Sequence, residues 1–196
     1  MKDFYTRSFE IVSEQKNDEH TITGRAIHYD APTLIQSTST SGKATEWYEV
    51  IDKTALVGCD VSDVPLTLEH DRKEVIARSR GGSLKFEYMP DGFYINAKML
   101  TQRGREVWES VKAGLLTAFS FAFPVDSVIE RDGTHDNKPL MRIKTIRKLL
   151  DVSVVYNPAY PGAFANARSA DVVDTIMQRE QTKTKLMILL NEELRK

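Results

Sequence analysis

Short apolar runs alternate with polar residues along the first 161 residues, and turn-forming residues separate the runs. Such a pattern is typical of strands, because strands are short and present two different faces. The clearest pair, 83–88 and 92–100, flanks a Met-Pro-Asp-Gly sequence and predicts a β-hairpin. Further strands are expected at 21–29, 46–51, 64–69, 117–125, 141–146 and 149–156. The pattern therefore predicts a β-rich domain.

Three segments interrupt the strand pattern. The segment 31–43 is rich in Ser, Thr and Gly, and 130–139 is polar, so both are expected to be loops. Asp52 is a candidate N-cap for a short helix that runs through Leu56.

One longer helix is expected between the strands. Thr101 is its candidate N-cap, and Gly114 is its candidate stop. Val107, Val111 and Leu115 recur at four-residue spacing and would form one apolar stripe on this helix.

From residue 169 onward the sequence changes to a charged, helix-forming tail. Its middle, 178–185, is polar, which makes it a poor core helix. Two interpretations remain open: an arm that contacts a partner or self-associates, and a partly ordered terminus. We therefore expect a domain over 1–168 and a helical C-terminal arm over 169–196.

Composition narrows the class of protein. The chain has 196 residues, of which 41% are hydrophobic and 28% charged, as in soluble globular domains. Its net charge of -1 provides no basic field for binding nucleic acid. A single cysteine, Cys59, excludes an internal disulfide and a cysteine-rich zinc site. We see no signal peptide and no apolar run that could span a membrane, so we expect a soluble cytoplasmic protein.

The segment 118–123 (AFSFAF) places a serine among aromatic residues. Because side chains alternate along a strand, Phe119, Phe121 and Phe123 share one face. Ser120 lies on the other face between two alanines, where there is space for a peptide carbonyl to approach its hydroxyl. On this pattern alone, an ordinary strand serine bonded to a neighbouring backbone is the more common explanation.

His70 and Asp151 are the matching candidates for proton transfer. His70 ends an apolar run in which Leu66 and Leu68 are expected on its side, and imidazoles titrate near neutral pH. Asp151 lies in an apolar run, where a carboxylate needs a partner such as an imidazole. From the residues alone, a structural histidine and a salt bridge from Asp151 to a nearby basic residue remain open.

The chain order His, Ser, Asp differs from the orders of chymotrypsin, subtilisin and the α/β-hydrolases, and no G-x-S-x-G motif surrounds Ser120. Those folds are therefore disfavoured, although the same constellation recurs on unrelated folds. The other histidines, His20, His28 and His135, are less well placed, since they lie in polar segments or on an early strand.

Three blocks surround the candidate residues: LTLEHD at 66–71, VKAGLLTAFSFAF at 111–123 and LDVSVVYNPAYP at 150–161. In this order and at this spacing, they resemble the prohead protease family of tailed phages. The likeness covers about 21–167.

The resemblance implies an α+β, β-rich fold like that of the herpesvirus assembly proteases: a mostly antiparallel β-barrel surrounded by helices. It also implies a serine endopeptidase, with Ser120 as nucleophile, His70 as base and Asp151 as the third member. Two positions depart from the family pattern, which usually has Glu in place of Asp151 and often has Gly in place of Ala122.

The resemblance further implies a role in capsid maturation. The protease would cut the scaffold segment from the major capsid protein, and often itself, inside the immature capsid in the bacterial host cytoplasm. We expect a homo-oligomer that needs no cofactor or metal and binds neither nucleic acid nor membrane. The alternative is a non-enzymatic capsid-assembly or scaffolding factor on the same fold.

Overall fold

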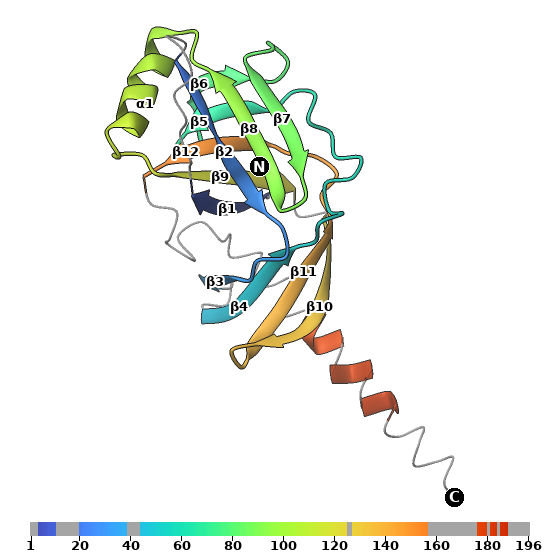
Figure 1. Cartoon of the computed structure of the whole chain (residues 1–196). Coiled ribbons are helices and arrows are strands. Elements are labelled where there is room, and N and C mark those ends of the chain that lie inside the picture. The colour runs from blue at the N-terminus through green and yellow to red at the C-terminus, as the bar shows by residue number, and fades with distance from the viewer. Residues whose placement is uncertain are drawn as a thin grey trace, which may run out of the picture.

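The computed structural model describes residues 4–10, 20–38, 44–124, 127–156, 176–179, 181–183 and 185–187. Within these ranges the strands form three sheets, of five, four and three strands, and an 11-residue helix packs against them (Figure 1). The predicted β-rich character is therefore confirmed.

The five-stranded sheet carries the candidate site. Its strands, in spatial order, are β1 (Phe4–Glu10), β9 (Ala118–Pro124), β12 (Asp151–Val155), β5 (Pro65–Leu68) and β6 (Asp71–Arg78). β9 pairs antiparallel with β1 and β12, whereas β12 runs parallel to β5. β12 is thus the central strand, between the strand that contains Ser120 and the hairpin that contains His70.

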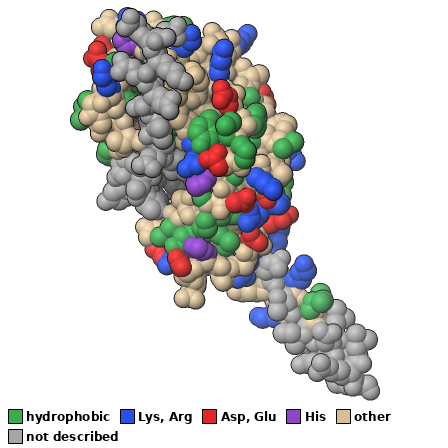
Figure 2. Space-filling view, viewed as in Figure 1, with side chains coloured by type: hydrophobic (Ala, Val, Ile, Leu, Met, Phe, Trp, Pro, Cys, Tyr) green, Lys and Arg blue, Asp and Glu red, His purple; other side chains and the backbone are tan. Residues whose placement is uncertain are grey.

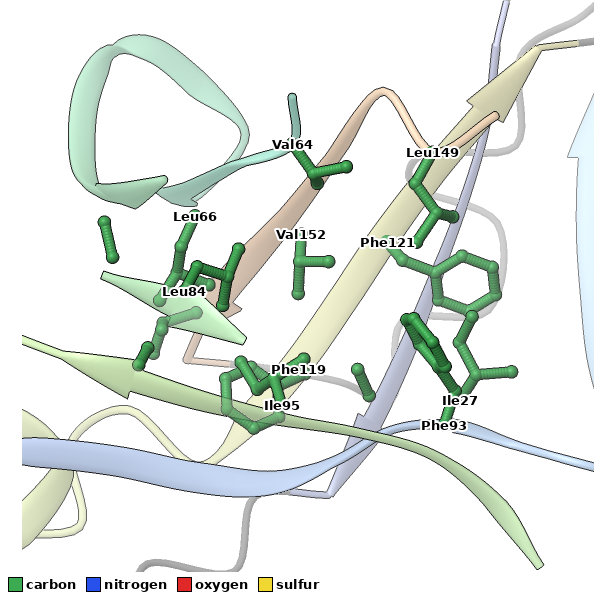
Figure 3. Close-up of a cluster of buried hydrophobic side chains, with 14 of the residues drawn as sticks. Ile27, Val64, Leu66, Leu84, Phe93, Ile95, Phe119, Phe121, Leu149 and Val152 are labelled. Atoms are coloured by element: carbon green, nitrogen blue, oxygen red, sulfur yellow. The ribbon is translucent and has the colours of Figure 1, made fainter. Parts of the chain in front are cut away.

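A three-stranded sheet crosses one face of the five-stranded sheet (Figure 1). Its strands, in spatial order, are β2 (Thr21–His28), β8 (Gly92–Lys98) and β7 (Leu84–Met89). β7 and β8 form the predicted hairpin. Phe93 and Ile95 of β8 share the main core with Phe119, Phe121 and Val152 of the larger sheet (Figure 3). Burying each such side chain contributes about 1.5–3 kcal/mol, so this interface fixes the position of the site strands.

Helix α1 (Gln102–Lys112) follows β8 and begins where the sequence predicts. The Thr101 hydroxyl caps it by accepting the Gly104 N–H. Val107 and Val111 are buried, but Leu115 is 67% exposed. The predicted stripe fails at Leu115 because Gly114, with a φ of 73°, ends the helix before this residue.

A four-stranded sheet forms the other end of the body (Figure 1). Its strands, in spatial order, are β10 (Val128–His135), β11 (Lys138–Thr145), β4 (Ala44–Ile51) and β3 (Thr33–Thr38). A small second core lies on it, formed by Ile35, Trp47 and Met141.

The C-terminal tail is helical at each residue from 176 to 187 that the structure describes. Ile176 and Met177 pack against the second core, and the tail then extends away from the sheets (Figure 1). Farther along, Leu186 and Met187 are exposed. The predicted helical character is confirmed for these residues, while the domain boundary between 168 and 169 stays a prediction.

The expected β-barrel is not confirmed, since the described strands form no closed barrel. A barrel needs its first and last strands to pair, but β1 and β6 are the edges of an open sheet in the described chain. The remaining strands are divided between two further open sheets. The expected surrounding layer of helices is not seen either. Among the described residues, α1 is the one helix that packs on the five- and three-stranded sheets.

Two expected loops contain strands. β3 lies within 31–43, and 130–139 contains most of β10 and the start of β11. β10 is exposed at nearly every position, so it lacks the apolar alternation by which strands are predicted. The expected helix after Asp52 is also wrong, because these residues form turns in which the Asp52 carboxylate accepts the Thr54 N–H.

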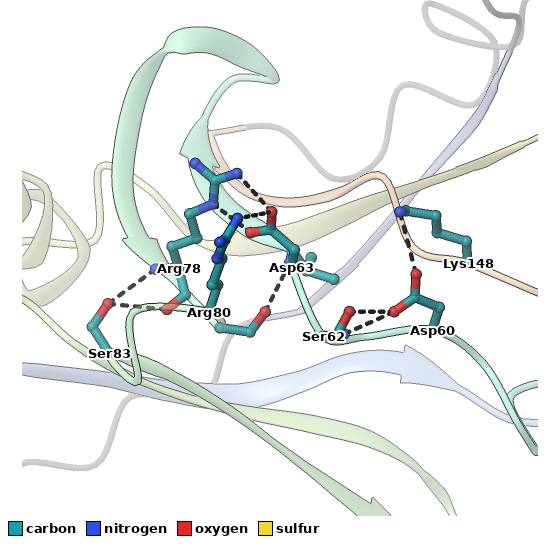
Figure 4. Close-up of polar contacts among 9 residues, drawn as sticks. Asp60, Ser62, Asp63, Arg78, Arg80, Ser83 and Lys148 are labelled. Atoms are coloured by element: carbon teal, nitrogen blue, oxygen red, sulfur yellow. Dashed lines mark hydrogen bonds and ion pairs between the residues drawn. The ribbon is translucent and has the colours of Figure 1, made fainter.

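Charged side chains fix the loop that leads into β5 (Figure 4). Asp63 binds the Arg78 guanidinium through two hydrogen bonds, of 2.6 and 2.9 Å. Asp60 accepts the Ser62 hydroxyl and backbone N–H and pairs with Lys148. These contacts, the Ser62 hydroxyl foremost, lower the pKa of Asp60 to about 2. The loop is therefore held by ionised carboxylates at neutral pH.

The surface carries no dominant charge on the face seen in Figure 2, where acidic and basic side chains are interspersed. This distribution agrees with the net charge of -1. Among the helices in the described ranges, none has the length and apolar character needed to cross a membrane.

Candidate active site

Ser120 lies on β9, on the face of the strand that alternation predicts. Phe119, Phe121 and Phe123 are fully buried in the main core. Ser120 therefore projects from the opposite face of the five-stranded sheet. It is only 1% exposed, so the open space expected around its hydroxyl is absent, and the imidazole of His70 lies against it.

Asp151 shares this face of the sheet with Ser120. The register pairs Ser153 of β12 with Ser120 and Asp151 with Ala122 of β9. Because residues two apart share a face, Asp151 and Ser153 project on the same side as Ser120. Asp151 is 7% exposed, and a buried carboxylate of this kind requires a hydrogen-bonding partner.

His70 reaches the site from a two-residue turn between β5 and β6. Glu69 and His70 have φ values of 51° and 58°, as a type I′ hairpin turn requires. This left-handed conformation costs a non-glycine residue about 1–2 kcal/mol, so surrounding contacts must stabilise it.

The side of the strand predicted for His70 is wrong. Leu66 and Leu68 pack against the main core, whereas the His70 ring lies on the Ser120 face. The strand ends at Leu68, and the turn carries the next residues across to the other side. Simple alternation, extended through a turn, cannot predict that change.

The three predicted side chains form one hydrogen-bonded chain. His70 Nδ1 lies 2.7 Å from Asp151 Oδ1, and His70 Nε2 lies 2.7 Å from Ser120 Oγ. An ionised carboxylate can only accept, so Nδ1 carries the proton of the neutral ring. Nε2 is then left to accept the Ser120 hydroxyl proton. Although Asp is one methylene shorter than Glu, its carboxylate reaches the imidazole.

Contacts to β12 hold the turn that carries His70. The Glu69 N–H donates to the Val154 carbonyl at 3.1 Å, and the Glu69 carboxylate accepts the Tyr156 N–H at 2.8 Å. The His70 N–H donates to Ser153 Oγ at 2.9 Å. β12 therefore supplies Asp151 and also anchors the turn that presents the histidine to it.

Ser153 and Thr67 are site residues that the sequence analysis missed. Both are fully buried, and their hydroxyls share a short hydrogen bond between β12 and β5. The signal was present, because Ser153 lies two residues after Asp151 and so must share its face. What could not be foreseen is that the turn would bring the His70 N–H to this hydroxyl.

Other candidate groups lie in different surroundings. His20 packs edge-on against Trp108, and His135 packs edge-on against Tyr48. Arg142 donates to Asp132 and lies in a cluster of carboxylates on the four-stranded sheet. In the ranges that the structure describes, no three His, Cys, Asp or Glu side chains are grouped to hold a metal ion.

The fold and this geometry define a β-rich protein with a Ser-His-Asp constellation on the outer face of a sheet. The model of the caudovirus prohead serine protease family matches residues 7–178 of the chain. The chain therefore belongs to the caudovirus prohead serine protease family, as the sequence resemblance predicted.

The chain was also compared with solved structures and with curated proteins. The structure of the bacteriophage T4 capsid assembly protease, gp21, is similar with a TM-score of 0.49 and 9% sequence identity. That similarity covers 79% of this chain and 98% of the T4 chain. Among curated proteins, no sequence matches.

Proposed function

We propose that the chain is a serine endopeptidase in which Ser120 is the nucleophile, His70 the general base and Asp151 the residue that orients His70. One observation carries the proposal: opposite nitrogens of one imidazole lie 2.7 Å from a serine hydroxyl and 2.7 Å from a carboxylate. That arrangement allows a serine hydroxyl to be deprotonated as it attacks.

The reaction follows from the positions of the protons. Ser120 Oγ attacks the scissile carbonyl carbon while its proton passes to His70 Nε2, and Asp151 stabilises the resulting imidazolium. His70 then gives that proton to the departing amine nitrogen as the peptide C–N bond breaks. A water molecule, deprotonated in turn by Nε2, hydrolyses the acyl ester and restores the Ser120 hydroxyl.

The substrate and setting follow from membership of the family. We propose that the protease cuts the major capsid protein and its scaffold segment within the immature capsid, in the host cytoplasm, and that it also cuts itself. Self-association through the C-terminal arm belongs to the same proposal, because Leu186 and Met187 are exposed on its helix.

Coexpression with the major capsid protein of the same phage tests the proposal. Ser120→Ala should leave the protein folded and abolish the shortening of the capsid protein, as measured by mass spectrometry. Ser127→Ala is the matched control, because its buried hydroxyl donates to the Pro124 carbonyl at the end of β9. Normal processing by Ser120→Ala would refute the mechanism. A capsid protein left at full length by the parent chain would instead favour a non-enzymatic assembly factor.

A further inference from the structure

The position of Ser153 gives its hydroxyl a definable role. Ser153 is fully buried and stands directly across from Ser120 on β12. Its hydroxyl bonds one group on β5, before the turn, and one group in the turn itself. Its Oγ accepts the His70 N–H at 2.9 Å and shares a short hydrogen bond with the Thr67 hydroxyl.

The backbone of His70 needs such an acceptor. A turn residue with a φ of 58° is in a costly conformation, and its N–H points into the sheet face instead of continuing the strand ladder. A buried N–H without an acceptor would add a further penalty. The Ser153 hydroxyl removes that penalty only while His70 stays in this conformation.

The bond also connects the backbone of His70 to the strand that bears its acid. Asp151 and Ser153 are two residues apart on β12, so one strand holds the ring through Nδ1 and the main chain through N–H. Two attachments to one rigid strand fix the direction in which Nε2 points at Ser120. Displacements of about 1 Å can cost a catalytic reaction about 100-fold.

We propose that Ser153 is a positioning residue of the active site, which acts through His70 and does not touch substrate. Thr67 supports it by fixing the rotation of its hydroxyl. This inference rests on the proposed function, because it assigns Ser153 a part in the same reaction.

Ser153→Ala tests the inference in the full-length protease with a fluorogenic peptide taken from the capsid cleavage site. The expected result is a fall in kcat of about 10- to 100-fold with KM little changed, because Ser153 does not contact substrate. Ser127→Ala should keep the parent values. An unchanged kcat in Ser153→Ala would overturn the inference.

A matched pair separates positioning from stability. Ser153→Thr and Ser153→Val have the same shape at the same buried position, but only the threonine retains a hydroxyl. Both overpack the site, so both lose stability. Ser153→Thr should retain several times the kcat of Ser153→Val. Equal kcat values in the two variants would assign Ser153 a packing role alone.

Proton NMR of the His70 Nδ1–H resonance measures the His70–Asp151 hydrogen bond separately from the stability of the fold. This resonance should broaden or disappear in Ser153→Ala while circular dichroism stays unchanged. A sharp, unshifted resonance would count against the inference. Activity retained in Ser120→Ala and His70→Ala would instead refute the proposed function itself, so the two failures are distinguishable.

Discussion

The five-stranded and the four-stranded sheets both bury polar side-chain atoms, but the two sheets differ in the hydrogen bonding of these atoms. On the first, Thr67, Ser120 and Ser153 each have a hydrogen-bonding partner. On the second, Thr45 Oγ1 and Trp47 Nε1 are buried without a partner in the described part of the chain.

The difference is that the buried hydroxyls of the five-stranded sheet are connected to the candidate site. Buried polar groups add rigidity and specify one arrangement when each is satisfied, whereas an unsatisfied group only costs free energy. The hydroxyls of the five-stranded sheet form a chain that ends on the His70 turn. On the four-stranded sheet, Thr45 Oγ1 and Trp47 Nε1 join no such chain within the described residues, and Trp47 packs in the small core with Ile35 and Met141.

Among substitutions that keep the Ser120 hydroxyl, the largest expected effect comes from Asp151, the acid that bonds His70. Asp151→Asn keeps the shape of the side chain but removes the charge that holds the proton on His70 Nδ1. We expect kcat to fall by about 10⁴-fold, as for the equivalent change in other serine proteases. Steady-state kinetics on a capsid-derived peptide measures this.

Asp151→Glu is the substitution to compare with Asp151→Asn. It retains the charge and restores the residue usual in the family, at the cost of one extra methylene in a buried position. Its kcat should lie well above that of Asp151→Asn. If the two variants were equally inactive, charge at this position would not be what His70 requires.

Two isosteric substitutions compare the sheets directly. Thr67→Val removes a hydroxyl that bonds Ser153, so the free energy of unfolding should fall by about 1–2 kcal/mol. Thr45→Val removes a hydroxyl without a partner and should be neutral or slightly stabilising. Urea unfolding measures both, and equal losses would remove the contrast between the sheets.

Acid should affect the charged loop before β5 more than the hydroxyl network. The folded pKa of Asp60 is about 2, below its ordinary value of 3.8. Its contribution to the free energy of unfolding is therefore complete above pH 3.8 and is lost as the pH falls through about 2. The stability difference between Asp60→Asn and the parent should shrink over this range, whereas the Thr67→Val difference should persist. A pH-independent Asp60→Asn difference would argue against this charge effect.

Much of the site could be predicted from the sequence because strand alternation is local. The shared face of Phe119, Phe121 and Phe123, opposite the face of Ser120, follows from alternation alone. The family blocks then selected His70 and Asp151, and the structure brings both to Ser120.

The features of the site that could not be predicted depend on long-range strand pairing and on turn geometry. Two positive φ values at the turn decide the face on which His70 lies, and neither Glu69 nor His70 is a residue that signals such a turn. The role of Ser153 depends on its register with β5 and β9, which are distant in the chain. The division of the described strands into three open sheets likewise follows from strand pairing, which composition does not encode.

The most direct test of the central claim is covalent labelling of the nucleophile. The protease is incubated with a fluorophosphonate, for long times because Ser120 is only 1% exposed, and the adduct is mapped by peptide mass spectrometry. We predict one adduct, on Ser120, that is absent in Ser120→Ala and strongly reduced in His70→Ala. An adduct on another residue, or capsid processing by a protein that never labels at Ser120, would contradict the account.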